Sequence, residues 1–129
     1  MNQTEVPIQS EYPGERRRKT PRIEVLGHLH GQLVAMDVPI IVRNLGAGGF
    51  GIESEVAFPV GATHTFRFTA ATGFRIVVSG AARHCQPFTG ADGVMRYRAG
   101  FEFLFDANGQ TARAVEALLE AVTSVLMLQ

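Results

Sequence analysis

The chain of 129 residues contains a single cysteine, has no excess of charge of either sign and has no long apolar run. One cysteine, Cys85, cannot form a disulfide within the chain, and it excludes a zinc site built from several cysteines. The 12 basic and 12 acidic residues cancel, whereas non-specific binding of nucleic acid needs a broad positive field. We therefore expect a protein of a reducing compartment that does not bind nucleic acid.

The lack of long apolar segments also bears on location. No segment approaches the ~18 apolar residues that a membrane-spanning helix requires. Residues 1–14 are polar and show neither the basic start nor the apolar run of a secretory signal. We expect a cytoplasmic protein with no membrane insertion. At this length the chain has room for one hydrophobic core and therefore for one domain.

The sequence divides into three parts. Residues 1–21 show almost no hydrophobic periodicity and hold three of the six prolines, which indicates a flexible arm. Residues 22–105 show short segments of alternating apolar and polar residues, the pattern of antiparallel strands. Apolar residues recur at spacings of three and four over residues 111–128, which predicts an amphipathic helix with Asp106 or Asn108 as its N-cap.

The middle part predicts six strands. The first begins at Arg22 and runs to a turn or bulge at His30-Gly31, and Ala71-Thr72-Gly73 is an expected hairpin turn. Six short antiparallel strands predict a mainly β fold, a small closed barrel, because closure removes exposed sheet edges. The helix is expected to cover an open end or side of it. The other strands are expected near Val38–Asn44, Phe50–Glu53, Thr63–Thr69, Phe74–His84 and Met95–Phe105. The phenylalanines expected in the core are Phe66, Phe68, Phe74, Phe101, Phe103 and Phe105.

Positive charge is concentrated at the start of the predicted barrel. Residues 15–22 hold five of the 12 basic residues, four of them arginines. An arginine presents a rigid fork of donors that suits a phosphate or the edge of a guanine. About one hairpin later comes Asn44-Leu45-Gly46-Ala47-Gly48-Gly49, whose glycine backbone can approach a ligand closely. Together the two segments indicate a pocket for a compact anion.

The order Arg17-Arg18-x-x-x-Arg22, then Asn44-x-Gly46-x-x-Gly49, resembles the PilZ family of cyclic di-GMP receptors. Members of that family carry an RxxxR motif before a six-stranded barrel and D/N-x-S-x-x-G at the end of the second strand. The segment Tyr97–Phe103 is similar to a late strand of the family, and a C-terminal helix is common there. The resemblance covers about residue 15 to the C-terminus.

The resemblance implies a division of the chain and a set of binding residues. Residues 1–14 would be a flexible N-terminal arm and residues 15–129 a PilZ-like domain, with the barrel over about 22–105 and the helix over about 109–128. In the binding site, the arginines would hold phosphates and guanine edges, the asparagine would read a guanine, and the last glycine would allow the turn. The implied residues are Arg17, Arg18, Arg22, Asn44, Gly46 and Gly49.

Gly46 departs from the family pattern. Ligand-binding members usually have serine at this position, so one hydroxyl is missing from the implied pocket. The loss of one such hydrogen bond typically costs about 1 kcal/mol, and up to ~3 kcal/mol where a buried partner stays unsatisfied. We therefore expect weakened binding and an improvement in the Gly46→Ser variant.

Two functions remain open. The first is a stand-alone cyclic di-GMP receptor in which binding orders the arm, and which passes this second messenger's signal to a downstream protein partner governing motility, biofilm or polysaccharide output. The second is a degenerate PilZ-like adaptor that binds proteins and no nucleotide. Retention of all three arginines favours the first. A nucleic-acid arm is a weaker third reading, because the net charge is zero.

No catalytic or metal site is expected. His28 and His30 share a face of the predicted first strand but have no further ligands placed by the sequence to complete a metal site. His84 and Cys85 are adjacent on a predicted strand and therefore point to opposite faces. We expect a protein that is not an enzyme and that needs no cofactor.

Overall fold

The computed structural model describes residues 21–127 of the chain. The predicted arm over residues 1–14 lies outside this range, as do Arg17 and Arg18 of the basic cluster and residue 128 of the predicted helix.

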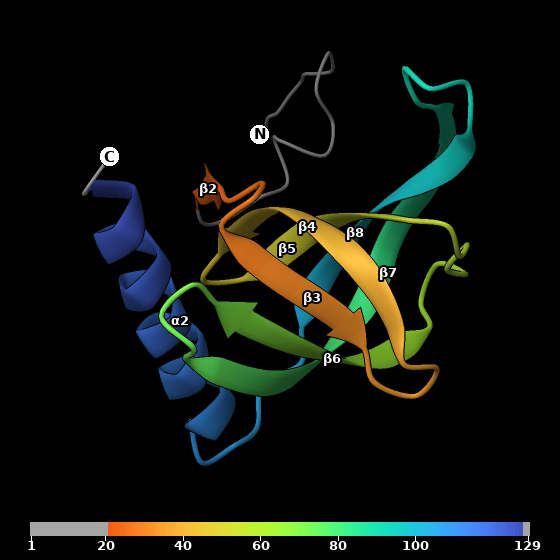
Figure 1. Cartoon of the computed structure of the whole chain (residues 1–129). Helices are drawn as coiled ribbons and strands as arrows, with labels where there is room; N and C mark the ends of the chain where they lie inside the picture. The colour runs from red at the N-terminus through yellow and green to blue at the C-terminus, as the bar shows by residue number, and fades with distance from the viewer. Residues whose placement is uncertain (1–20, 128–129) are drawn as a thin grey trace, which may run out of the picture.

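A closed barrel of six antiparallel strands forms the centre of the described chain (Figure 1). The strands follow one another around the barrel in the order β4-β3-β6-β7-β8-β5, and pairing between β4 and β5 closes it. The seventh described strand, β2, pairs with β4 outside the ring. The predicted six-stranded barrel with a C-terminal helix is thus confirmed. The elements are β2 (Arg22–Glu24), β3 (Leu29–Leu33), β4 (Val38–Gly46), β5 (Gly49–Ser54), β6 (Thr63–Ala70), β7 (Arg75–Thr89), β8 (Met95–Phe103) and α2 (Gln110–Met127).

The predicted first strand is interrupted by a tight turn. The Val25 N–H still donates to the Arg43 carbonyl of β4 at 2.8 Å, but the His28 N–H then donates back to the Val25 carbonyl at 2.8 Å. Gly27, inside this turn, has a φ of 84°, a conformation that favours glycine. The prediction that His28 and His30 share a strand face is therefore wrong, because His28 belongs to the turn.

The turn predicted at His30-Gly31 is also wrong. Both residues lie inside β3 and pair with Ile41 and Ile40 of β4. The chain reverses later, where the Asp37 N–H donates to the Val34 carbonyl at 3.3 Å. Gly31 nevertheless has a packing reason, since a Cβ there would lie 2.6 Å from a methyl group of Val42.

A cluster of phenylalanine rings fills the barrel around Phe50. The Phe50 ring stacks on Phe101, with ring centroids 5.2 Å apart and planes 6° from parallel. It meets Phe66 and Phe68 edge-on at 5.1 and 4.9 Å. Both geometries are favoured by aromatic quadrupoles, at roughly 0.5–1.5 kcal/mol per pair beyond the area buried. Phe103 lies 5.2 Å from Phe50, and Phe58 lies 5.1 Å from Phe101, so the barrel interior is filled by contacting rings and not by aliphatic packing alone.

The core prediction is correct for four of the six phenylalanines that were expected inside. Phe66, Phe68, Phe101 and Phe103 are buried, whereas Phe74 and Phe105 are 39% and 50% exposed. The two exposed rings lie just outside β7 and β8, beyond the strand ends. Their alternating spacing continues the strand pattern, but Phe74 closes the β6–β7 turn, where its carbonyl accepts from the Ala70 N–H at 2.8 Å, and Phe105 follows the end of β8. Phe50 and Phe58 are buried as well.

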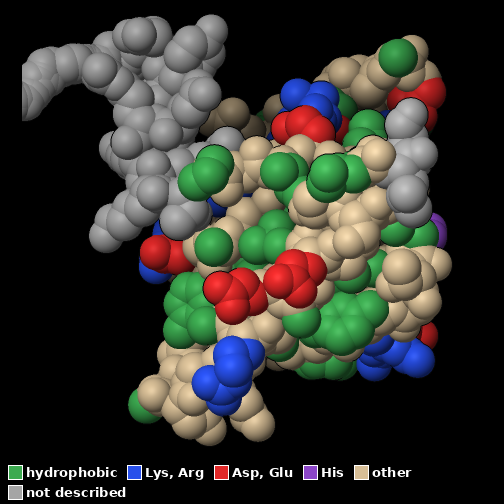
Figure 2. Space-filling view, turned by 90° about the vertical axis from the view of Figure 1, so that its left-hand side faces the viewer, with side chains coloured by type: hydrophobic (Ala, Val, Ile, Leu, Met, Phe, Trp, Pro, Cys, Tyr) green, Lys and Arg blue, Asp and Glu red, His purple; other side chains and the backbone are tan. Residues whose placement is uncertain are grey.

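The helix α2 covers the side of the barrel near β6 and β7, as expected (Figure 1). Val115, Leu118 and Val122 form its buried stripe. Its solvent side carries Glu116 and Glu120, and Figure 2 shows acidic side chains in the middle of this face among hydrophobic ones. Among residues 21–127 no helix has the length and hydrophobicity needed to span a membrane.

Both predicted caps bind the first turn of α2. The Gln110 N–H donates to the Asn108 Oδ1 at 3.1 Å, and the Thr111 N–H donates to the Asp106 Oδ1 at 2.9 Å. These bonds satisfy donors that have no partner within the helix. The bond from Thr111 stabilises the carboxylate and lowers the pKa of Asp106.

We expect the stability that Asp106 contributes to depend on pH. A carboxylate with a lowered pKa in the folded state stabilises the fold above its unfolded pKa of about 3.9, and this contribution is lost as the pH falls through the folded value. Asp106→Ala should therefore lower the melting temperature at pH 7, and the deficit should shrink as the pH falls below about 4.

Thermal melts by circular dichroism at a series of pH values measure this effect. Glu120→Ala is the control, because it removes an exposed carboxylate from the middle of the same helix. An Asp106→Ala deficit that stays constant down to the lowest pH would show that the ionised cap is not its source.

Candidate functional site

A β-bulge in β4 shapes one side of the candidate site. The pairing of β4 with β5 shifts register between Val42 and Asn44. Val42 and Leu45 are both buried, at 1% and 0% exposure. Two successive residues between them, Arg43 and Asn44, therefore lie on the outer side, which regular alternation does not allow and a bulge does.

A second bulge lies in β7, where the pairing with β8 shifts between Ala82 and His84. Ala82 is buried and Cys85 packs against the core. Arg83 and His84 between them are exposed on the outer face. The expectation that His84 and Cys85 point to opposite faces is therefore confirmed.

The two bulges meet at a pair of glycines on the central strands. Asn44 in β4 pairs with Gly51 in β5, and Gly51 pairs with Gly100 in β8. Gly100 in turn pairs with His84 in β7. A Cβ on Gly51 would lie 2.9 Å from the Asn44 amide, and a Cβ on Gly100 would collide with the His84 imidazole. We call Gly51 and Gly100 the glycine floor, because the Asn44 amide and the His84 imidazole lie against their backbone.

Four of the implied binding residues lie together at one end of this row. Arg22 pairs with Gly46 in the sheet, and its Nη1 donates to the Asn44 Oδ1 at 3.1 Å. A Cβ on Gly49 would lie 2.9 Å from the Arg22 Nη2. The guanidinium is thus held against the asparagine and over the last glycine of the predicted motif.

Gly46 has a packing reason to lack a side chain. A Cβ at this position would lie 2.5 Å from the carbonyl oxygen of Pro21 and 2.9 Å from the Arg22 Cγ. Real Cβ atoms do not approach neighbours within 3.0 Å. The close approach of β2 to β4 therefore depends on glycine, and a serine would require β2 to move. This geometry reverses our expectation that Gly46→Ser improves binding.

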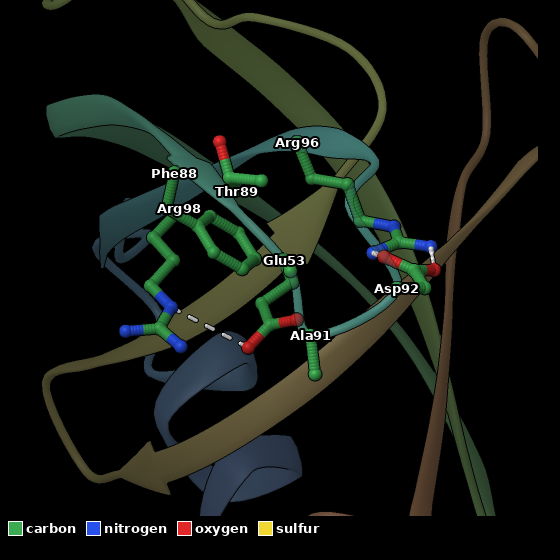
Figure 3. Close-up of a pocket in the computed structure, with 8 residues that line it drawn as sticks. Glu53, Phe88, Thr89, Ala91, Asp92, Arg96 and Arg98 are labelled. Carbon is green, nitrogen blue, oxygen red and sulfur yellow. Dashed lines mark hydrogen bonds and ion pairs between the residues drawn. The ribbon is translucent and has the colours of Figure 1, made fainter.

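Carboxylates neutralise the arginines along the rest of the face. Glu53 forms an ion pair with Arg43 and a second with Arg98, at 3.5 Å between the Arg98 Nε and the Glu53 Oε2 (Figure 3). On the other side of the glycine floor, the Arg83 Nη2 lies 2.6 Å from the Glu102 Oε1. These pairings reduce the attraction that Arg43, Arg98 and Arg83 can offer to an anion.

An open hollow continues the face beyond Glu53, toward the projecting β7–β8 hairpin (Figure 3). The Arg98 guanidinium lies 4.3 Å from the centroid of the Phe88 ring, a cation–π contact. The Arg96 guanidinium hydrogen-bonded to Asp92 lowers the pKa of that carboxyl to about 2. The pair is ionised at neutral pH and closes the far end of the hollow.

Sequence reasoning missed the glycine floor and the position of His84. One signal was present, since Gly49-Phe50-Gly51-Ile52 alternates glycine with large apolar residues and so leaves the outer side of β5 bare. The bulges gave no comparable signal. Within residues 21–127, no group of three or more metal-ligating side chains comes together.

Comparison with known proteins identifies the fold. Neither a sequence family nor a curated protein matches the chain. The structure of the K. pneumonia MrkH–c-di-GMP complex matches with a TM-score of 0.67 at 14% identity, covering 88% of this chain and 56% of MrkH. The c-di-GMP-bound PilZ domain of YcgR from Escherichia coli matches with a TM-score of 0.64 at 15% identity, covering 85% of this chain and 94% of the YcgR domain. The chain has a PilZ-like fold.

A third structure extends the comparison. The Bacillus subtilis inhibitor of motility, MotI/DgrA, matches with a TM-score of 0.61 at 18% identity, covering 88% of this chain and 52% of that protein. The PilZ-like chain thus spans about half the length of MrkH and of MotI, and nearly all of the YcgR domain.

We expect Gly46→Ser to destabilise the PilZ-like barrel by about 1–3 kcal/mol, the usual cost of forcing extra atoms into a packed site. The added Cβ must displace the Pro21 carbonyl and with it the pairing of β2. Chemical denaturation measures the change. Ala47→Ser is the matched control, because it adds the same hydroxyl at the exposed neighbouring position. A Gly46→Ser protein as stable as the wild type would contradict the packing role of Gly46.

Proposed function

We propose that this chain is a receptor for cyclic di-GMP, is not an enzyme, and binds the dinucleotide on the outer face of the barrel near β2 and β4. The observation that carries the proposal is the contact of Arg22 with Asn44 and with the backbone at Gly49. These residues come from two separate segments of the implied motif. Their convergence at one corner is what a shared ligand would require.

The chemistry of this corner suits an anion with guanine bases. A guanidinium donates two parallel hydrogen bonds to a phosphate or to the O6 and N7 of guanine. Gly46 and Gly49 carry no side chains, which lets Arg22 lie close against the backbone at this corner. Arg17 and Arg18 would supply further donors, and they lie outside the described residues. The fold supports the same ligand, since MrkH and the YcgR domain carry c-di-GMP in their structures.

In this proposal, binding orders the segment that carries Arg17 and Arg18, and the ordered segment then presents a new surface to a protein partner in the cytoplasm. MotI is an inhibitor of motility, and we infer an output of the same kind, in motility, biofilm or polysaccharide production. The receptor needs no cofactor and no nucleic acid for this role.

One observation favours a second candidate function, a protein-binding adaptor that has lost the ligand. Arg43, Arg98 and Arg83 of the outer face are paired with Glu53 and Glu102. Such pairing lowers the positive potential that a dianion would meet. The two candidates therefore differ in one measurable property, the affinity for cyclic di-GMP.

Isothermal titration of cyclic di-GMP into the protein tests the proposal. We expect micromolar or tighter binding, and a loss of at least about tenfold in Arg22→Ala, because hydrogen bonds to charged groups are worth roughly 1.5–3 kcal/mol. Arg18→Ala should weaken binding as well. Arg75→Ala is the control, because Arg75 is exposed at the start of β7, next to the Ala71–Gly73 turn.

No heat and no competition with about 100 μM ligand would contradict the receptor proposal and favour the adaptor. An equal loss of affinity in Arg75→Ala and Arg22→Ala would show that the effect is one of net charge and not of the corner at Asn44.

A further inference from the structure

We infer that His84 is a binding residue for the same ligand: its imidazole contacts a guanine from the β7 side while Asn44 contacts it from the β4 side, over the glycine floor. This inference rests on the proposed function, because the ligand is the same dinucleotide. His84 lies outside both predicted motifs, more than 30 residues after the last of their positions.

The bulge in β7 is what brings His84 to the outer face. Ala82 is buried, so regular alternation would place residue 84 inside the barrel. The extra residue, Arg83, shifts the register and turns His84 outward, opposite Gly100. Bulges commonly re-aim a side chain beside a binding site. Arg83 itself is held by Glu102 on the same face.

The glycine floor lets the Asn44 and His84 side chains lie directly against the sheet. Gly51 and Gly100 are direct partners on β5 and β8, and both are buried. Each lacks a Cβ that would collide with the side chain beside it, the Asn44 amide or the His84 imidazole. Two polar groups thus reach inward from opposite strands toward one glycine pair. The Asn44 amide and the His84 imidazole therefore bound the space over Gly51 and Gly100.

The polar atoms facing this floor suit guanine better than adenine. Because the Asn44 Oδ1 accepts from Arg22, its amide nitrogen remains to donate to a ligand. The His84 imidazole lies over Gly100, and an imidazole N–H is a hydrogen-bond donor. One edge of guanine carries two acceptors, O6 and N7, whereas adenine carries an amino donor in place of O6. His84 would therefore add selectivity as well as affinity.

Titration of cyclic di-GMP and cyclic di-AMP into wild type and His84 variants tests the inference. We expect His84→Ala to bind cyclic di-GMP about five- to thirtyfold more weakly, the effect of one good hydrogen bond to a ligand, and to discriminate less against cyclic di-AMP. His84→Gln offers a side-chain N–H and should bind within about threefold of wild type. His84→Phe keeps a ring without a donor and should behave like His84→Ala.

His30→Ala is the matched control, because His30 is an exposed histidine of β3 that pairs with Ile41 and Thr69, away from the floor. Wild-type affinity and selectivity in His84→Ala would overturn the inference and leave the receptor proposal intact. Wild-type behaviour of His84→Phe would overturn the hydrogen bond assigned to the imidazole. Failure of the wild-type protein to bind cyclic di-GMP would overturn both the receptor proposal and this inference.

Discussion

The stacking of Phe50 on Phe101 fixes the arrangement on which the rest of the structure depends. These two rings belong to directly paired residues of β5 and β8, so burying both rings in the barrel fixes the register of the two strands. A slip of one residue would turn every inward side chain outward. The same register brings Gly51 opposite Gly100 on the other side of the sheet. The register of β5 and β8 therefore fixes both the aromatic core and the glycine floor on the outer side.

The two bulges place the polar side chains on either side of the glycine floor and the arginines next to them. Each bulge places an arginine next to a polar residue on the outer face, Arg43 beside Asn44 and Arg83 beside His84. Glutamates on the central strands pair with both arginines. Arg98 shares Glu53 with Arg43, so these three arginines of the face are matched by two carboxylates, and their charge is only partly neutralised.

How much the sequence predicts depends on whether a feature is local. The strand alternation around Phe66 and the helix capped by Asp106 follow from local spacing, and both are present. The turn at Gly27 was missed because Ile23, Val25 and Leu29 keep the alternation of a single strand on both sides of it. The bulges were missed because an extra residue can be recognised only against the partner strand. The contact of Gly46 with Pro21 and Arg22 was missed because it depends on where β2 lies. The convergence of Arg22 with Asn44 was anticipated from family resemblance and not from periodicity.

The shortness of β2 has a consequence for how the barrel edge is protected. Asn44 and Leu45 of β4 pair with β5 on one side, and residues Asn44–Gly46 pair on the other side with the three residues of β2. Without β2, this stretch of β4 would present unpaired N–H and C=O groups, the kind of edge that recruits a strand from another chain. The segment that supplies Arg22 thus also covers this edge of β4. Any event that lifts Arg22 from its place would uncover a surface for strand addition at the same moment.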